Sequence, residues 1–475
     1  MRKFQHYFLV LITFLGFSSC EKETTNMTLP ERPDIVSSES LLRDSVFYYT
    51  HYFYLWQDKL PINYNLHQHR TADDLLRALR QYAKDPSGQV LDRFSFLDRE
   101  KSVNSEIQNS QYGDFGFNVR YLNANDLYIK VVYENSPAYA AGLRRGWKVV
   151  EINGRTDLDM QSMEQDNFEF LFNALYGNLI SMKVQDPQNQ IHQVHLTKSQ
   201  YQFNPILKSS ILETPSKKVG YFALEAFVSQ NLLEQPLNSL FQNFHAAGVE
   251  SVIVDLRYNG GGDVSTANFI SNLLAPQSVQ DKLMNRYEIN TTLTQDGWGF
   301  FLFFPEYFDK KNSLNIEDVY FLVSNSTASA SELLINNLTP YMNVHMIGDD
   351  VTYGKPVGYF GWDIMGIDLY AVSFKTLNAL GEGDYFSGLV PDFYTIDDVS
   401  KEFGDPQEAM LYAALNHVEQ GSFTSGVANR NLSMYKNPLR ASPDVQEANK
   451  RLESAKRKDM FDFRKSSLAQ KELQK

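Results

Sequence analysis

The sequence predicts a protein of several domains, in which a helical region is followed by a β-rich unit and then by an α/β domain. Three observations lead to this fold class. The chain has 475 residues, more than a single hydrophobic core normally supports. Apolar residues have helical spacing near the amino terminus, alternate strictly at residues 127–132, and form strands between helices after residue 205. A content of 43% apolar and 13% aromatic residues is sufficient to fill these cores.

The amino-terminal residues predict export. Two basic residues precede an apolar run over residues 7–17, which is too short to span a bilayer as a finished helix. Cys20 is the only cysteine and follows small residues, an arrangement similar to a bacterial lipobox, whose cysteine is acylated. We therefore expect a signal peptide over residues 1–19 and a lipid anchor at Cys20. An ordinary signal peptide with a chance cysteine is the alternative, and disulfides within the mature protein are excluded by count.

The charge of the chain limits its partners. The formal net charge is −13 and becomes −15 once a leader containing Arg2 and Lys3 is removed, which argues against nucleic acid as a partner. We expect an acidic, exported protein of this kind to act on proteins or peptides in the cell envelope, with attachment to the membrane through Cys20.

A tether and a small helical domain are expected next. Residues 20–35 are polar and contain two prolines, as is typical of a linker. Apolar residues at helical spacing over residues 37–60 and 71–84 indicate helices, and we place a helical domain at residues 36–105. Its aromatic residues are interpreted as packing rather than as a binding surface.

A compact β-rich unit is predicted over residues 112–198. The segments that carry it are Gly113–Val119, the alternating strand Leu127–Val132 and Ala141–Gly154. These segments resemble a PDZ domain. The resemblance implies that amides of the loop at Phe115, Gly116 and Phe117 capture a terminal carboxylate while a strand edge accepts the peptide. A unit that serves only as a structural brace is the alternative.

The segment 205–420 has the alternating pattern of an α/β domain. Expected strands lie near residues 219–226, 251–256, 319–324, 343–348 and 367–375. Expected helices lie near residues 237–247, 265–274 and 330–341.

A serine and a lysine in this domain are the most informative pair. Ser329 opens an apolar helix-like run, and Lys355 follows 26 residues later. A serine hydroxyl needs a base within hydrogen-bond reach, and a buried lysine can serve because burial disfavours its charged form. The structural alternative is a capping box, in which Ser329 and Glu332 satisfy the first amides of the helix. A phosphate-binding loop is unlike this sequence, because five residues separate Gly348 from Gly354 and Pro356 follows the lysine.

Three consecutive glycines follow a second buried strand. The strand Val252–Leu256 leads directly into Gly260, Gly261 and Gly262. Glycines permit positive φ and let the backbone approach a ligand without a Cβ, so this loop can direct bare amides at an oxyanion. A tight turn would explain one or two of these glycines but not all three.

The order of these motifs resembles the carboxyl-terminal processing proteases, a family of tail-specific serine peptidases. The resemblance covers roughly residues 36–418 and rests on Asp255–Gly262, Thr327–Glu332 and Val351–Lys355. It implies a catalytic domain with the spiral of ββα units found in ClpP and crotonase. It also implies that Ser329 is the nucleophile and Lys355 the general base.

Further site residues follow from the same resemblance. The amide of Ala330 and a glycine amide at Gly261 or Gly262 would form the oxyanion hole, and a helix starting at Ala330 would add its positive end. Many family members have a glutamine four residues after the lysine, whereas this chain has Tyr359. Tyr359 is interpreted either as an orienting partner of Lys355 or as a core aromatic.

Residues 421–475 are expected to form a basic, helix-prone tail, with a solvated helix as the default and a position on the enzyme's acidic surface or on anionic lipid as the alternatives. The nine histidines show no spacing typical of a metal site, and no cofactor is implied. The sequence therefore predicts a lipid-anchored serine endopeptidase of the envelope. One rival is a non-proteolytic relative that binds apolar peptides or small molecules. The other is an acyl hydrolase or hydratase of crotonase-like architecture.

Overall fold

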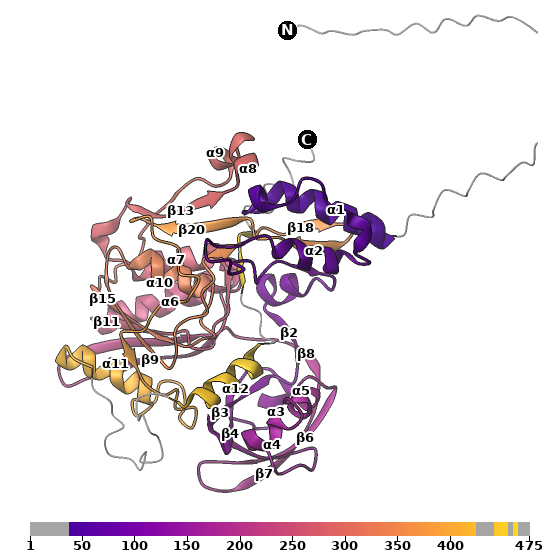
Figure 1. The fold of residues 1–475 in the computed structure, drawn as a ribbon. Coiled ribbons are helices and arrows are strands. Elements are labelled where there is room, and N and C mark those ends of the chain that lie inside the picture. The colour runs from indigo at the N-terminus through magenta and orange to yellow at the C-terminus, as the bar shows by residue number, and fades with distance from the viewer. Residues whose placement is uncertain (1–37, 424–440, 455–458, 464–475) are drawn as a thin grey trace, which may run out of the picture. The chain divides into compact units, whose positions relative to one another are not determined.

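The computed structural model describes residues 38–423, 441–454 and 459–463 (Figure 1). The residues from Glu39 onward belong to one unit. The predicted signal peptide, Cys20 and the tether lie outside the described residues. Within the described part of the chain, no helix combines the length and apolar character that crossing a membrane requires.

A six-stranded sheet with strand order β21-β16-β15-β11-β10-β9 is the centre of the second half. All neighbouring strands are parallel except β9, which pairs antiparallel with β10. The strands are β9 (Ile206–Glu213), β10 (Lys218–Leu224), β11 (Ser251–Asp255), β15 (Asp318–Val323), β16 (Asn343–Gly348) and β21 (Phe393–Tyr394).

Helices cover both faces of this sheet (Figure 1). Phe222 and Val254 face a core shared with three helices, whereas Tyr221 and Ile253 face the core under a fourth. Burial of both faces explains why these strands are almost continuously apolar. The three helices are α6 (Gln230–Ala247), α7 (Val264–Leu274) and α10 (Ala330–Leu338), and the fourth is α11 (Ala409–Gln420).

A second sheet in this half of the chain has four strands, in the order β14-β13-β20-β17. The strand expected at residues 367–375 is in fact two strands in different sheets. Strand β19 (Ile367–Tyr370) pairs with β1 (Phe96–Asp98) and β18 (Trp362–Ile364), whereas β20 (Phe374–Asn378) pairs with β13 and β17. The strands of this sheet are β13 (Leu283–Ile289), β14 (Glu306–Tyr307), β17 (Val357–Gly358) and β20 (Phe374–Asn378).

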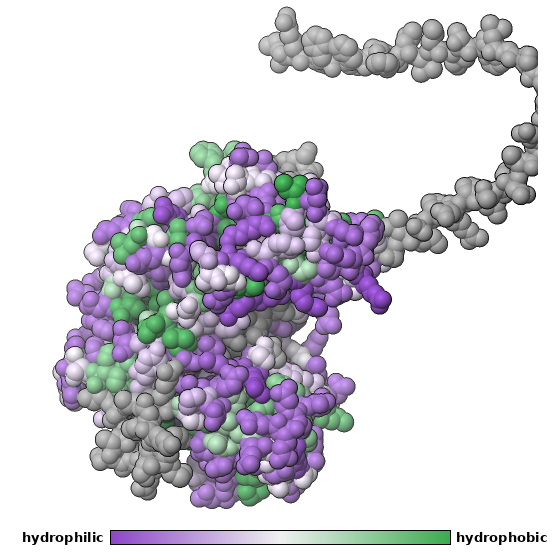
Figure 2. Space-filling view, viewed as in Figure 1, coloured by the Kyte–Doolittle hydropathy of each residue, from purple (hydrophilic) through white to green (hydrophobic). Residues whose placement is uncertain are grey.

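A short excursion between β13 and β14 carries an exposed apolar tip. It contains α8 (Thr291–Gln295) and α9 (Trp298–Phe301), and Figure 2 shows apolar atoms at this end of the molecule. Phe300 is 82% exposed and Phe301 is 68% exposed, while Trp298 is buried against the aromatic rings of α1.

The amino-terminal region contains the two expected helices. They are α1 (Ser38–Phe53) and α2 (Ala72–Arg80), and Thr71 caps α2 by accepting the Asp74 amide at 3.1 Å. This region also contributes β1 (Phe96–Asp98) to a sheet with β19 and β18 (Trp362–Ile364). Its core therefore includes residues from the second half of the chain, among them Tyr359 and Tyr370.

The β-rich unit is a five-stranded antiparallel sheet with three short helices and a separate two-stranded ribbon. The sheet has the order β3-β4-β5-β6-β7, so β3 lies at an edge. The strands are β2 (Gln111–Asp114), β3 (Phe117–Asn123), β4 (Asp126–Val132), β5 (Lys148–Ile152), β6 (Leu179–Gln185), β7 (Ile191–Thr197) and β8 (Ser199–Gln202). The helices are α3 (Pro137–Ala140), α4 (Met160–Glu164) and α5 (Glu169–Leu175).

The described part of the carboxyl-terminal tail is packed, which differs from the expected solvated helix. Helix α12 (Pro443–Glu453) contributes Val445, Ala448 and Leu452 to the core of the β-rich unit. These residues are spaced at i, i+3 and i+7 and so share one helix face, a pattern that the surrounding charged residues hide in the sequence. Strand β22 (Asp459–Phe461) then pairs in parallel with β12 (Gly261–Asp263).

Candidate active site

The glycine loop is anchored by a buried arginine. Arg257 follows β11, is 1% exposed, and makes ion pairs of 2.7 to 2.9 Å with Asp255, Asp397 and Glu408. A buried guanidinium requires such partners, since an unpaired buried charge is very costly. The sequence places Asp255 two residues before Arg257, so this pair could be anticipated. The other two carboxylates, Asp397 and Glu408, come from the far end of the domain.

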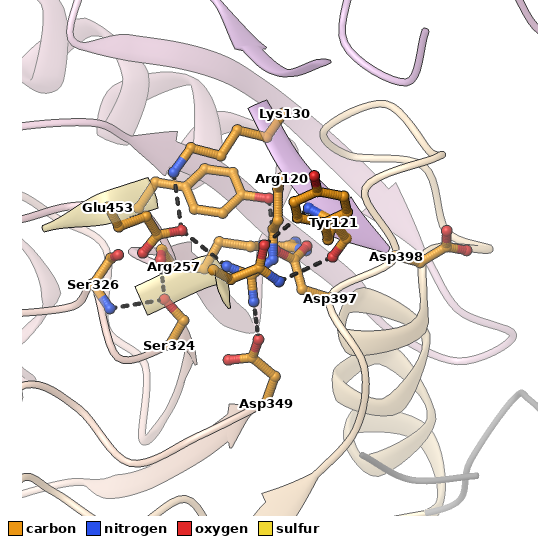
Figure 3. Close-up of polar contacts among 12 residues, drawn as sticks. Arg120, Tyr121, Lys130, Arg257, Ser324, Ser326, Asp349, Asp397, Asp398 and Glu453 are labelled. Carbon is orange, nitrogen blue, oxygen red and sulfur yellow. Dashed lines mark hydrogen bonds and ion pairs between the residues drawn. The ribbon is translucent and has the colours of Figure 1, made fainter. Parts of the chain in front are cut away.

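Asp397 joins this anchor to the β-rich unit. Its carboxylate pairs with Arg257 and, at 3.0 Å, with Arg120 of β3, which also pairs with Asp349 and Glu453 (Figure 3). Burial alone would raise the pKa of Asp397, but the surrounding guanidiniums outweigh it and hold the pKa below its usual range. The loop and the β-rich unit are thus held by one charge network.

Asn259 fastens the glycine loop to its neighbours. Its side-chain amide donates to the Leu224 carbonyl at 2.9 Å and accepts the Gly261 amide at 2.8 Å. Its own carbonyl accepts the Ala328 amide at 3.1 Å, which ties the loop to the turn before Ser329. The Gly261 amide is therefore engaged within the protein, and Gly262 is the remaining predicted glycine donor.

Gly262 is required by the backbone geometry. Its φ is +138°, and a Cβ at this position would lie 2.1 Å from the Phe227 carbonyl oxygen. The Phe227 amide in turn donates to the Gly261 carbonyl at 2.9 Å. The loop consequently packs closely against the segment after β10 and forms a short strand, β12.

Ser329 stands on a strained turn between β15 and α10. Its φ and ψ are +66° and −112°, a region that non-glycine residues rarely occupy and that costs about 1–3 kcal/mol. The turn is braced by the Thr327 hydroxyl, which donates to the Leu256 carbonyl at 2.8 Å. A serine on a strained strand-to-helix turn, with its hydroxyl at the helix N-terminus, is the geometry that presents nucleophiles in many hydrolases.

Ser329 and Glu332 have the arrangement of a capping box. Glu332 accepts the Ser329 amide at 2.8 Å, whereas the serine oxygen faces the Glu332 amide without a hydrogen bond of normal geometry. Ser329 is fully buried, and its Oγ has no hydrogen-bond partner among the described residues. The Ala330 amide at the start of α10 likewise donates to no other residue in the described ranges.

Glu332 joins the serine to the lysine segment. The same carboxylate oxygen that accepts the Ser329 amide accepts the Lys355 amide at 2.9 Å, and the other oxygen accepts the Gly354 amide at 2.8 Å. Burial raises the pKa of Glu332, while these hydrogen bonds and one from Thr352 limit the rise. From the sequence, Glu332 was interpreted only as a possible helix cap. No sequence pattern indicated its contact with the Lys355 amide.

Lys355 lies in an aromatic pocket. It is fully buried, and its Nζ donates to the Tyr359 hydroxyl at 2.6 Å and lies 5.2 Å from the centre of the Phe94 ring. The Tyr359 hydroxyl donates to the Phe94 carbonyl at 3.2 Å. Tyr359 is therefore both a partner of the lysine and a core aromatic, so the two interpretations of this residue are compatible. Since Ser329 Oγ has no partner, a direct hydrogen bond between serine and lysine is absent from this arrangement.

The predicted peptide-binding loop of the β-rich unit has an internal partner. The Gly116 amide donates to the Asp114 carboxylate at 2.7 Å, and Tyr201 donates to the same oxygen at 2.7 Å. Phe115 and Phe117 are buried in the core. The amide that was expected to capture a peptide carboxylate thus contacts the chain's own carboxylate here.

Comparison with known proteins identifies the domain that carries this site. Residues 218–366, which include the glycine loop, Ser329 and Lys355, match the model of peptidase family S41. This segment is similar to peptidase family S41. The predicted family resemblance is therefore confirmed, and the chain is similar to carboxyl-terminal processing proteases.

Two relatives of the S41 segment illustrate the similarity. A carboxyl-terminal-processing protease of Synechocystis is 25% identical over 232 residues, which cover 49% of this chain and 50% of that protein. The chloroplastic carboxyl-terminal-processing peptidase 3 of Arabidopsis thaliana is 26% identical over 240 residues, which cover 48% of this chain and 42% of that protein. The match to this chain thus spans about half the length of these curated relatives.

The fold is also similar to that of a solved S41 structure. A candidate S41 protease from Bacteroides fragilis superposes with a TM-score of 0.62 at 23% identity, and the match covers 83% of this chain and all of that one. At this identity the likeness establishes the multidomain α/β fold.

Proposed function

We propose that this protein is a serine endopeptidase in which Ser329 is the nucleophile and Lys355 is the general base. The observation that carries the proposal is Ser329 itself, which has a strained backbone at a helix start, a hydroxyl without a hydrogen bond of normal geometry among the described residues, and an amide that shares one Glu332 oxygen with the Lys355 amide. Strain of this kind persists where surrounding structure maintains it, and it gathers at functional sites.

The reaction would proceed through an acyl-enzyme. Ser329 Oγ attacks the peptide carbonyl carbon while its proton passes to the neutral amine of Lys355. A neutral amine that donates to Tyr359 still has its lone pair for this proton, so Tyr359 would position the base. The carbon–nitrogen bond then breaks, the leaving amine takes the proton from Lys355, and water activated by the same amine hydrolyses the ester.

The developing oxyanion would be stabilised by backbone amides. Ala330 supports this role because its amide is unengaged and lies at the positive end of α10. Gly262 is the glycine donor that we favour, because the Gly261 amide is donated to Asn259.

The substrates would be proteins or peptides, selected in part by their tails. The five-stranded β-rich unit, in which β3 is an edge strand, supports a PDZ-like role, since strand edges accept extended peptides. The sequence around Cys20 supports a membrane-anchored lipoprotein of the bacterial envelope. Metabolic labelling tests the anchor: wild type should take up fatty acid and fractionate with membranes, whereas Cys20→Ser should do neither.

The decisive experiment measures cleavage of casein and of a tailed peptide. Ser329→Ala should abolish turnover and leave the fold intact. Ser326→Ala is the matched control, because Ser326 lies in the same turn and also has a buried hydroxyl without a partner in the described chain. Ser331→Ala should retain substantial activity. Full turnover by Ser329→Ala would refute the assignment, and a wild type that binds peptides without cleaving them would favour the non-proteolytic alternative.

A further inference from the structure

The carboxyl-terminal segment, which we define as the described residues 441–454 and 459–463, lies on two surfaces that a peptide substrate would use. The first is the edge strand β3. The side-chain amide of Asn449 in α12 accepts the Tyr121 amide at 2.8 Å and donates to the Tyr121 carbonyl at 2.9 Å. Both backbone groups of an edge residue are thereby satisfied, as a neighbouring strand would satisfy them.

The end of α12 adds a carboxylate to this contact. Glu453 accepts from Arg120 at 2.9 Å and from Lys130 at 3.0 Å, and all three side chains are buried (Figure 3). A buried pair of cations requires an anion, and the segment supplies it from its own helix. The helix is therefore held by specific polar contacts as well as by its apolar face.

The second surface is the cleft between the glycine loop and the lysine segment. Strand β22 pairs in parallel with β12, with Gly262 opposite Met460. On its other side, the Tyr359 amide donates to the Met460 carbonyl at 2.9 Å and the Asp462 amide donates to the Tyr359 carbonyl at 3.0 Å. The strand thus lies between the loop that carries a proposed oxyanion donor and the residue that contacts Lys355.

The cleft fits an extended backbone closely. A Cβ on Gly358 would lie 2.4 Å from the Phe374 ring and 2.8 Å from the Met460 carbonyl oxygen, so a side chain here would clash with the core as well as with the strand. Met460 is fully buried in the main core, and the Phe461 ring lies 5.4 Å from Tyr359 and 5.1 Å from Tyr370. The bound strand therefore presents two consecutive large apolar side chains to formed pockets.

A cavity of about 220 Å³ adjoins both surfaces. It is lined by the glycine loop, by Glu453 at the end of α12, and by Asn118, Lys130 and Tyr133 of the β-rich unit. It provides space for peptide residues between the β3 edge and the glycine strand.

We propose that the carboxyl-terminal segment is an internal peptide ligand, in which Asp459–Phe461 occupies the groove that takes a substrate strand and α12 covers the β3 edge. The ligand class is an extended peptide with apolar side chains at the positions of Met460 and Phe461. The proposal rests on the proposed function in one respect only, namely that this groove is the substrate site. A substrate must then displace the segment, and the apparent affinity falls with the fraction of molecules in which the groove is open.

Binding can be tested without turnover in a Ser329→Ala background. The probe is a fluorescein-labelled peptide with the sequence of residues 456–466, and the readout is fluorescence anisotropy. Full-length Ser329→Ala should bind the probe weakly. Adding Met460→Asp and Phe461→Asp should release the internal strand and lower the Kd by ~10-fold or more, as expected if the groove is open in about a tenth of wild-type molecules. A probe with the same two aspartates is the matched control and should not bind.

Each remaining outcome decides the proposal. If the released variant is folded and binds no probe, or if it binds no more tightly than the intact chain, the segment is not a ligand. If the released variant fails to fold, thermal unfolding with added unlabelled peptide decides: recovery of the wild-type Tm supports the proposal, and no recovery shows that the segment is a permanent part of the core. In a chain that retains Ser329, release should lower KM for casein. A chain without peptidase activity would refute the proposed function but leave the binding results to decide this inference.

Discussion

The two walls of the candidate active site are held in place by different forces. The serine wall, which comprises the glycine loop and the turn to Ser329, rests on the ends of central strands. Arg257 and its three carboxylates anchor it, and Asn259 fixes it by backbone hydrogen bonds. This wall depends on buried charge and on the main sheet.

The lysine wall, which comprises residues 351–359, is held mainly by aromatic packing. The Lys355 amine lies against Phe94 of the amino-terminal region and against Tyr359, which is bridged to Phe461 of the carboxyl-terminal segment. Glu332 connects this wall to the nucleophile through backbone amides, and the Tyr353 amide donates to the Thr327 carbonyl in the turn before Ser329 at 2.9 Å.

Mutations in the two walls should therefore have different effects, on stability in one wall and on turnover in the other. Removal of a charge from the serine wall should mainly lower the free energy of unfolding, because partners are left buried without compensation. Changes on the lysine wall should mainly lower turnover, because the pocket is apolar and tolerates side chains of similar volume. The amino-terminal region, which has no catalytic motif, thereby contributes to the surroundings of the base.

The largest expected effect is at Lys355. Lys355→Met should lower kcat by on the order of 10³-fold or more while the protein stays folded, since the base is lost and an apolar chain fills the pocket. Lys355→Arg should be similarly inactive, because a guanidinium remains protonated. Peptide cleavage and thermal unfolding should be measured together. An arginine variant with near-normal turnover would mean that the residue acts as a fixed charge.

Arg257 tests the opposite wall. Arg257→Leu should lower the free energy of unfolding by about 3–5 kcal/mol, because Asp255, Asp397 and Glu408 lose their shared cation. Urea denaturation measures the change, and the exposed residue Arg77 provides a control in which Arg77→Leu should change stability by less than about 0.5 kcal/mol. A stable Arg257→Leu protein that has lost only its activity would contradict the proposal that the serine wall depends on buried charge for its stability.

Tyr359→Phe should have a smaller effect confined to chemistry. Loss of the hydroxyl removes the 2.6 Å contact with Lys355, and a hydrogen bond of about 0.5–1.5 kcal/mol corresponds to a loss of up to ~10-fold in kcat. A role in positioning the base also requires the pH–rate profile to shift, which a purely structural role would not cause. An unchanged profile with reduced stability would make Tyr359 a core residue only.

The last test concerns pH and the charge network. Burial raises the pKa of Asp349 to about 7, although Arg120 opposes the rise. The protonated carboxyl therefore favours the folded state, so its contribution is fully present below the unfolded pKa near 4, falls by up to about 1.4 kcal/mol per pH unit between pH 4 and 7, and is lost above pH 7. Asp349→Asn should remove this slope in urea titrations between pH 4 and 7. A slope equal to that of wild type would exclude Asp349 as its source.

The sequence was a good guide to the central sheet and a poorer guide to its edges. The strands at residues 251–256 and 319–324 were placed well because burial on both faces leaves a nearly continuous apolar run. Helix α6 begins at Gln230 rather than near residue 237, and Pro236 lies inside it. The break between β19 and β20 was missed because apolar residues continue across it while the strands change sheets.

For the site, local motifs placed the serine, the lysine and the glycine strand in one region, but not the groups that surround them. Phe94 and Asp397 reach the site only through tertiary packing, so no spacing in the sequence could reveal them. The contact between β22 and β12 was hidden for a different reason, since the apolar pair at residues 460–461 stands among charged residues.

Asp397 has a consequence for how relatives of this protein can diverge. Its two oxygens serve Arg257 and Arg120, and a third guanidinium, that of Arg145, lies 3.5 Å away. Replacing the aspartate by a neutral residue would remove a carboxylate that three buried guanidiniums share, and replacing a single arginine would leave an excess of negative charge. Stepwise substitution therefore passes through poorly folded intermediates. These four positions should be inherited as a block, retained together or exchanged together for apolar residues, even where the surrounding sequence has changed beyond recognition.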